Sequence, residues 1–241
     1  MHQFFCETPL KIGEPYILTK EQAHHAENVA RLLNEKVRLV HSGEAWFGVL
    51  EKKDGKVTAM VTEKDQNTHE NKAEIILAMA LIRREKFELV LQKATELGVT
   101  RIIPFESSRC VVRSKEEKAA KNRQRRTDIV REAAQQCKRN IIPEVSEAVS
   151  FEEMLKTEAE CRMAAYENAY GSGSTLSRTI GKQRSFLIVI GPEGGFSEEE
   201  MERMKKEGLI EVTLGSRILR AETAAISACA LISELSENQW L

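Results

Sequence analysis

Two segments near the C-terminus carry the residue types from which a ligand site is built. The sequence IGPEGGFS occupies positions 190–197, and LGSRILRAETAA occupies 214–225. Each follows an apolar run typical of a buried strand and precedes a helical pattern. Loops at the carboxyl ends of such strands are where an open α/β sheet binds ligands. The second segment also carries Arg217, Arg220 and Glu222, whose charges suit the stabilisation of an anion and the acceptance of a proton.

The glycine loop does not have the features of a phosphate site. Neither of the common phosphate-binding glycine fingerprints occurs in the chain. Ser197 is the expected N-cap of the following helix, and Glu200 stands at the capping-box position. Three glutamates in that first turn complement the positive helix end and would repel a phosphate. The loop therefore favours a neutral or cationic ligand, although Gly194-Gly195 could also serve only as a tight turn.

The C-terminal two-thirds of the chain carries further motifs in a fixed order. They are KATELGV at 93–99, IIPF at 102–105, REAAQQCKRN at 131–140 and AYE at 165–167. With the two glycine segments, this ordered set resembles the RsmE family, the ribosomal RNA uridine-N3 methyltransferases of the SPOUT superfamily. The resemblance implies an α/β fold with a mainly parallel sheet and a C-terminal trefoil knot. It places a PUA-like β-barrel that binds RNA in residues 1–70 and the methyltransferase domain in residues 73–241.

The resemblance also implies the reaction and its cofactor. The expected activity is S-adenosylmethionine-dependent methylation of N3 of a uridine in 16S ribosomal RNA, on the assembled 30S subunit. The residues that match the family's cofactor loops are Gly191, Pro192, Glu193, Gly194, Gly195, Leu214, Gly215, Ile218, Leu219 and Ala225. Two roles stay open: Glu193 could attract the sulfonium or bond to loop amides, and Thr223 could cap the last helix.

The chemistry at uridine N3 points to the charged residues of the second loop. The base must be unpaired or extruded, and its N3 proton must leave. Negative charge then spreads onto O2 and O4, which a guanidinium would stabilise. Arg220 and Arg217 are the candidates, and Glu222 could orient one of them or accept the proton. The alternative is that Arg220 and Glu222 form only a structural ion pair.

The charge distribution indicates where RNA would bind. Lys plus Arg (36) nearly balances Asp plus Glu (37), yet residues 113–139 hold ten basic and four acidic side chains by direct count. Such a local excess is typical of a phosphate-backbone contact or of a solvated helix face with ion pairs. The predicted RNA-binding residues are Arg83, Arg84, Lys86, Arg131, Lys138 and Arg139.

Composition narrows the class of protein further. Five scattered cysteines fit a reducing cytosol, and all five histidines precede residue 70, so no histidine-based site is expected in the C-terminal region. We find neither a signal peptide nor an apolar run that could span a bilayer. The sequence therefore predicts a cytoplasmic protein without a metal or membrane partner. The Ala- and Ser-rich last helix, through the resemblance, implies a homodimer.

The predicted elements follow from periodicity. Residues up to about 66 are β-rich, with hairpin turns at Ser42-Gly43 and Asp54-Gly55. Strands and helices then alternate, with a basic helix over 115–139 and helices over 151–157, 175–180, 197–207 and 223–235.

Three positions depart from the family pattern: Gln3 replaces an arginine, Asn34-Glu35 replaces a Gly-Asp turn, and Ser216 replaces proline. The first two weaken the expectation of N-terminal RNA contacts. Two other functions compete with the one expected: methylation of another RNA target (a ribose 2′-hydroxyl or a tRNA base), and a non-catalytic RNA-binding role in ribosome assembly.

Overall fold

The chain forms two compact units. The computed structural model describes residues 1–114, 116–171 and 174–238, so Lys115, the predicted start of the basic helix, lies outside the described residues. One unit comprises Met1–Glu70 together with Ala134–Ile141, and the other comprises Asn71–Ala133 with Ile142–Leu241. The sequence predicted a single domain boundary between residues 70 and 73. In the structure Ala134–Ile141 also belongs to the N-terminal unit, which the sequence did not indicate.

The N-terminal unit is built on a small mixed sheet of five strands. Their order is β1-β3-β4-β5-β2, with β1 parallel to β3 and the other pairs antiparallel. The strands are β1 (Gln3–Phe5), β2 (Pro15–Ile17), β3 (Lys36–His41), β4 (Glu44–Lys53) and β5 (Lys56–Asp65). A short α-helix, α1 (Lys20–His24), continues into a π-helical turn at His25–Val29. Both hairpin turns predicted from the sequence are confirmed, because Ser42-Gly43 and Asp54-Gly55 adopt positive φ between paired strands.

Two buried arginines join the returning segment to this unit. The Arg38 side chain is 1% exposed, and it donates to Asp65 Oδ2 (2.7 Å), Gln3 Oε1 (2.7 Å) and Asn140 Oδ1 (2.6 Å). Burial would raise the pKa of Asp65, but the hydrogen bonds from Arg38 and Asn67 and the charge of Arg38 together outweigh it, and the pKa lies below its usual value. A guanidinium has five donors, and this network engages it on all three nitrogens.

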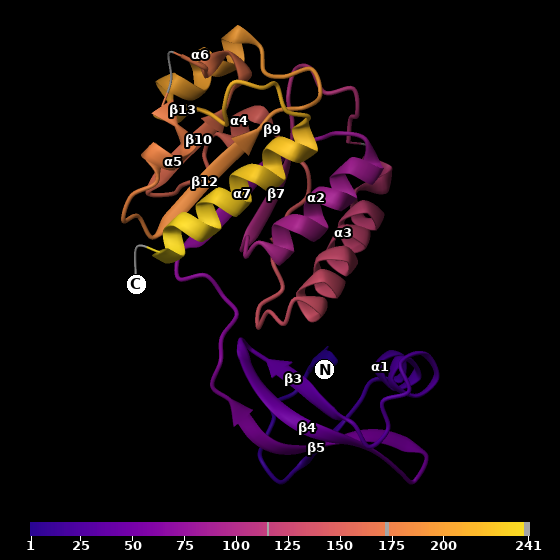
Figure 1. Cartoon of the computed structure of the whole chain (residues 1–241). Helices are drawn as coiled ribbons and strands as arrows, with labels where there is room; N and C mark the ends of the chain where they lie inside the picture. Colours follow the sequence, from indigo (N-terminus) through magenta and orange to yellow (C-terminus); the bar gives the residue numbers. More distant parts are fainter. Residues whose placement is uncertain (115, 172–173, 239–241) are drawn as a thin grey trace. The chain divides into compact units, whose positions relative to one another are not determined.

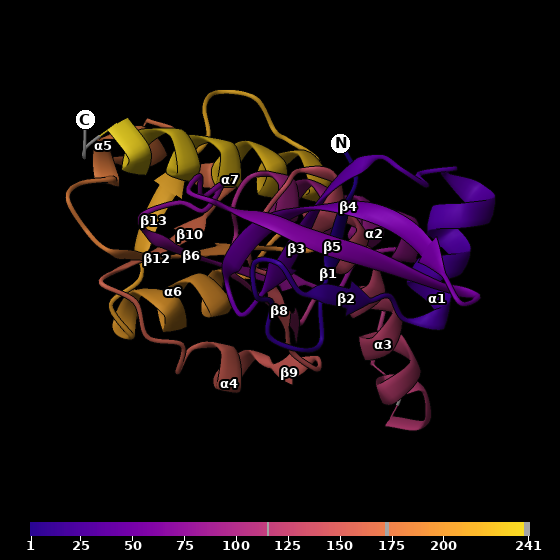
Figure 2. The same ribbon diagram turned by 90° about the horizontal axis from the view of Figure 1, so that it is seen from below.

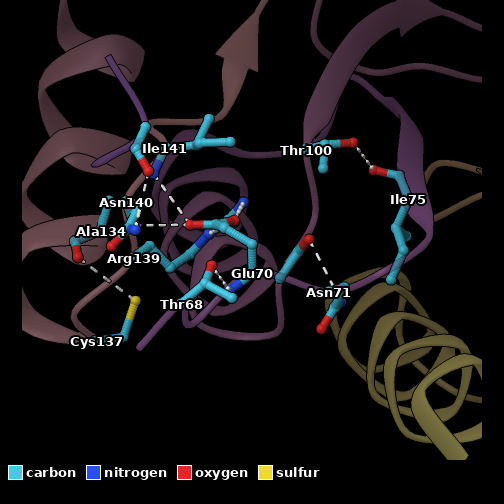
Figure 3. Close-up of polar contacts among 12 residues, drawn as sticks. Thr68, Glu70, Asn71, Ile75, Thr100, Ala134, Cys137, Arg139, Asn140 and Ile141 are labelled. Atoms are coloured by element: carbon cyan, nitrogen blue, oxygen red, sulfur yellow. Dashed lines mark hydrogen bonds and ion pairs between the residues drawn. The ribbon is translucent and has the colours of Figure 1, made fainter. Parts of the chain in front are cut away.

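The second arginine, Arg139, is 2% exposed and pairs with Glu70 at 2.7 Å. The same carboxylate accepts the backbone amides of Asn140 (2.7 Å) and Ile141 (3.0 Å), as Figure 3 shows. The prediction that Arg139 contacts RNA is therefore wrong, because its side chain is buried and forms an ion pair with Glu70 inside the N-terminal unit. The sequence shows that an arginine is charged, but it does not show whether the side chain is buried.

The C-terminal unit contains an eight-stranded sheet in which every pair is parallel. Along it the order is β11-β13-β10-β12-β6-β7-β8, and β9 pairs with β7. The strands are β6 (Glu74–Ala80), β7 (Arg101–Glu106), β8 (Glu144–Val145), β9 (Val149–Ser150), β10 (Cys161–Ala165), β11 (Ser174–Thr175), β12 (Ser185–Ile190) and β13 (Ile210–Thr213). The central β6 and β12 are almost continuously buried, as expected for strands covered on both faces. The predicted α/β fold with a mainly parallel sheet is confirmed.

Helices cover the two faces of this sheet. They are α2 (Arg84–Glu96), α3 (Glu116–Gln136), α4 (Phe151–Met154), α5 (Leu176–Thr179), α6 (Glu198–Lys206) and α7 (Ala221–Asn238), and a 3₁₀ turn lies at Glu167–Ala169. Helix α7 packs on β6 and β12 and lies beside α2 (Figure 1). Figure 2 shows α6 and α4 on the opposite face from α7. None of the helices among the described residues has the length and apolar content needed to cross a membrane.

The Arg139–Glu70 pair gives a test of the N-terminal unit. We expect Arg139→Met to lower the free energy of unfolding by about 3 to 5 kcal/mol, because it leaves a largely buried carboxylate without its cation. Lys11→Met is the matched control, since the Lys11–Glu14 pair is exposed (72% and 63%) and should change stability by less than about 1 kcal/mol. Urea denaturation of both variants measures the difference, and equal losses would contradict the assignment.

Candidate functional site

A cavity of about 550 Å³ opens where four segments of the C-terminal unit meet. Its walls come from the ends of β10, β12 and β13 and from the start of α2. The three strands are neighbours in one parallel sheet, so their carboxyl ends lie at the same edge. This is the position at which α/β sheets bind ligands, and it confirms that the two glycine segments of the sequence come together.

The loop after β12 owes its shape to its glycines. The amide of Gly195 donates to the carbonyl of Pro192 at 3.0 Å, which closes a tight turn. Gly195 has a φ of +66°, and a Cβ there would come within 2.4 Å of Glu167 Oε1. A Cβ on Gly191 would lie 3.1 Å from the Phe196 ring. Larger residues at these positions would therefore displace the walls of the cavity.

The capping residues predicted after this loop are confirmed. Ser197 is the N-cap of α6, and Ser197 and Glu200 form the reciprocal capping box. The first turn carries Glu198, Glu199 and Glu200, which supports the conclusion that the loop does not suit a phosphate.

The loop after β13 is fixed at its start and exposed further on. Thr213 Oγ1 donates to the Gly215 carbonyl (3.1 Å) and accepts the Gly215 amide (3.2 Å). Ile218 lines the cavity and is 85% exposed. Helix α7 begins at Ala221, so Thr223 lies inside its first turn and the suggestion that it caps the helix is wrong.

Glu222 is the buried carboxylate of the cavity, and its ion partner is Lys86 at 3.0 Å. Burial would raise the pKa of Glu222, but its own backbone amide, Lys86 and Arg220 hold that pKa below its usual value. The carboxylate also lies in the first turn of α7, where the helix dipole favours a negative charge. The sequence suggested an ion pair of Glu222 with Arg220 or Arg217; across the described residues, the ion pair found for Glu222 is the one with Lys86.

Glu193 projects toward the neighbouring helix. Its Oε1 accepts the backbone amide of Arg83 at 3.2 Å, at the N-cap of α2. A carboxylate satisfies one of the free amides that every helix start leaves. Two roles were left open for Glu193, attraction of a sulfonium and a bond to a loop amide. The structure shows a bond to an amide, but it is the amide of Arg83 and not one of the glycine loop.

Most residues predicted for the cofactor loops line the cavity. These are Gly191, Pro192, Glu193, Gly195, Leu214, Gly215, Ile218 and Leu219, and the three catalytic candidates Arg217, Arg220 and Glu222 line it too. Gly194 and Ala225 are not among the lining residues: a Cβ on Gly194 would face Arg109, and Ala225 is fully buried within α7 beside the lining residue Ala224.

The predicted RNA-binding residues near α2 separate into two groups. Arg83 and Lys86 line the cavity. Arg84 instead pairs with Glu88 at 2.8 Å, and Glu88 also holds Arg125 of α3, so the two arginines bring its pKa to about 2.

The basic helix α3 has less free charge than its composition suggests. Arg131 is exposed, whereas Lys138 lies beyond the helix end and donates to the Gln135 carbonyl at 3.2 Å. Arg126 lies over the Phe87 ring at 4.9 Å, and Arg123 pairs with Glu147 at 3.6 Å. The alternative of a helix face with ion pairs therefore describes much of α3.

Sequence reasoning did not assign Tyr166, Glu167, Phe196 and Thr213 to the cavity, although all four line it. Part of the signal was present, because Thr213 ends β13 and Tyr166 and Glu167 come just after β10, whereas Phe196 lies at the far end of the loop after β12. The described residues contain no group of three His, Cys, Asp or Glu side chains that could hold a metal ion.

Comparisons with known proteins agree with this fold and site. The family model for an RNA methyltransferase domain matches residues 69–233, which defines the class of the C-terminal unit. The ribosomal RNA small subunit methyltransferase E of Bacillus subtilis is 35% identical over 98% of both chains. The chain therefore belongs to the RsmE family, as the motifs implied.

Two solved structures are similar over nearly the whole chain. The ribosomal RNA small subunit methyltransferase E of Neisseria gonorrhoeae, bound to S-adenosyl methionine, aligns with a TM-score of 0.88 at 29% identity over 98% of both chains. A methyltransferase from Legionella pneumophila, in complex with the same cofactor, aligns with a TM-score of 0.87 at 29% identity over 96% of both chains.

The glycine loop gives a matched pair of substitutions. Gly195 and Gly208 both have positive φ, but only at Gly195 would a Cβ meet another group, Glu167. We expect Gly208→Ala to cost about 1 to 2 kcal/mol of backbone strain, and Gly195→Ala to lower the free energy of unfolding further because Glu167 must move. Chemical denaturation compares the two; a smaller loss for Gly195→Ala would contradict the geometry of the cavity wall.

Proposed function

We propose that this protein transfers a methyl group from S-adenosylmethionine to N3 of a uridine in 16S ribosomal RNA, on the assembled 30S subunit. The observation that carries the proposal is one cavity that brings Arg217, Arg220 and Glu222 together with both glycine loops. Membership of the RsmE family supports the same reaction.

The cavity has the size and lining that the methyl donor requires. Its volume of about 550 Å³ lies within the range of small-molecule sites. Leu214, Ile218 and Leu219 offer apolar surface for an adenine ring, and the Gly191–Gly195 loop brings backbone close to the space. The donor, when bound there, supplies a methyl group on a positively charged sulfur. The three glutamates that line the cavity, Glu167, Glu193 and Glu222, favour that charge.

The charged residues then act on the uracil ring. We assign Arg220 and Arg217 to O2 and O4, where their guanidinium groups stabilise the negative charge that grows as the N3 proton leaves. Glu222 accepts that proton while the N3–methyl bond forms and the carbon–sulfur bond breaks. Lys86 keeps Glu222 ionised and fixes its position from the side of α2.

The finer features of the architecture belong to the proposal as well. A C-terminal trefoil knot is supported by the path of the chain: β13 lies beyond β10, and α7 then returns to pack on β12 and β6. A PUA-like barrel is the proposed form of the N-terminal unit, in keeping with its five-stranded sheet.

The proposal also covers the partners. Arg83, at the cavity, and the exposed Arg131 are the proposed phosphate contacts. A homodimer through α7, in the cytoplasm, completes it; the small side chains of that helix would allow close approach of a second copy.

The product of the reaction is the direct test. Incubation with labelled S-adenosylmethionine and small-subunit particles that lack their native modification should yield 3-methyluridine, read by nucleoside mass spectrometry. Glu222→Gln should lower kcat by about 10² to 10⁴-fold, because a general base is lost. Label in a ribose or in tRNA would indicate a different RNA target, and RNA affinity without cofactor binding would indicate a non-catalytic assembly factor.

The Lys86–Glu222 pair predicts a pH effect. Lys86→Met removes the cation that lowers the pKa of Glu222, so the carboxylate should protonate at a higher pH. The acid limb of the kcat/KM profile should therefore shift upward, with the largest loss of rate at low pH. The other charged groups of the cavity, Arg83, Arg217, Arg220, Glu167 and Glu193, remain in the variant.

Lys206→Met, an exposed change at the end of α6, is the control for that profile. It should leave the acid limb where it is. An unshifted limb in Lys86→Met would show that Glu222 is not the titrating base.

A further inference from the structure

The loop that follows β7 contacts the glycine loop that follows β12, although β6 lies between the two strands in the sheet. Ser107, Ser108 and Arg109 form the first loop and are absent from the wall of the cavity. Their contacts reach the outer side of Gly191–Phe196, a segment that does line it. None of these three residues belongs to a motif that sequence analysis connected with the ligand.

Arg109 bridges two carbonyls of the glycine loop. One guanidinium nitrogen, Nη1, donates to the carbonyl of Gly194 at 3.2 Å and to that of Phe196 at 3.1 Å. A Cβ on Gly194 would lie 3.3 Å from the Cβ of Arg109, tighter than most packing contacts. The missing side chain of Gly194 is thus what lets the stem of Arg109 approach, which explains a glycine that does not line the cavity.

Glu200 fastens the same two loops from the buried side. Its Oε1 accepts the amide of Ser108 at 2.8 Å, and its Oε2 accepts from Ser107 Oγ (3.2 Å) and from the amide of Ser197 (3.0 Å). The carboxylate is buried, so all three bonds act in a medium of low dielectric where they are strong. The sequence predicted Glu200 only as a capping residue of α6.

We infer that Arg109, anchored through Glu200, is a positioning residue that holds the Gly191–Phe196 loop in its ligand-binding shape. The inference rests on the proposed function, because it assigns that loop to the methyl donor. Arg109 engages the Gly194 and Phe196 carbonyls outside the cavity, and Glu193 is tied to the start of α2 by the Arg83 amide. The loop is therefore held by the loop after β7 and by the start of α2 before a ligand binds. This lowers the conformational entropy that the loop loses on binding.

Arg109→Met tests the inference, with Arg109→Lys as the conservative variant. Arg184→Met is the control, an exposed arginine just before β12 at the end of the strand remote from the loop. Calorimetry with S-adenosylmethionine should give a Kd about tenfold higher for Arg109→Met, the loss expected from charged hydrogen bonds. KM for the donor should rise by the same factor with kcat within about twofold, and Arg109→Lys should recover part of the affinity.

Hydrogen exchange without any ligand supplies an independent measurement. Amides of residues 193–197 should exchange faster in Arg109→Met than in the wild type and in Arg184→Met, while the core strand β6 stays protected in all three. Gly194→Ala, which pushes against the Arg109 stem, should reproduce the faster exchange.

Unchanged affinity together with unchanged exchange in Arg109→Met would overturn the inference. A fall in kcat with an unaltered Kd would also overturn it, because Arg109 would then act in the chemistry rather than on the loop. If the wild type itself binds no S-adenosylmethionine, the proposed function fails, and the exchange of residues 193–197 alone decides the role of Arg109.

Discussion

The parallel alignment of β13, β10, β12 and β6 is the constraint on which the site depends. Because these strands are adjacent and point the same way, their carboxyl ends deliver three separate loops and the start of α2 to one edge. β6 and β12 are buried along nearly their whole length and are paired on both sides, so their ends are firmly placed at this edge. The loops can then be rich in glycine and still hold a fixed shape, because their ends are set by the sheet.

The cavity balances opposite charges at short range. Four cations, Arg83, Lys86, Arg217 and Arg220, surround it together with three glutamates. Two of these acids have partners: Glu193 accepts the Arg83 amide, and Glu222 pairs with Lys86. The first of these contacts uses the backbone of Arg83 and leaves its guanidinium aside, whereas the second takes up the charge of Lys86. Arg217 and Arg220 of the second loop line the same cavity, where their charges suit an anionic ligand. A carboxylate held ionised in the wall of the cavity suits the methyl transfer proposed above better than phosphate chemistry.

Periodicity and turn residues were enough to predict the longer strands, the two hairpin turns and the capping box of α6, because each is determined within a few neighbouring residues. The meeting of the two glycine loops also followed, since both come after strands of one parallel sheet. What could not be predicted depends on distant partners. Neither the Lys86–Glu222 pair nor the Arg109 contacts have a local pattern: the partners are 136 and 85 or 87 positions apart along the sequence.

Burial explains why some arginines are unavailable as surface charges. Arg139 and Arg38 look like surface cations in sequence, but each is neutralised by an acid of the N-terminal unit, Glu70 or Asp65. Gln3, which replaces the family's arginine, is itself buried and bridges these two, because it accepts from Arg38 and donates to the Arg139 carbonyl at 2.7 Å. An amide can serve both neighbours at once, since it has a donor and an acceptor, whereas a third guanidinium there would add an unpaired buried charge. Gln3 thus completes this network, and its side chain is used inside the N-terminal unit.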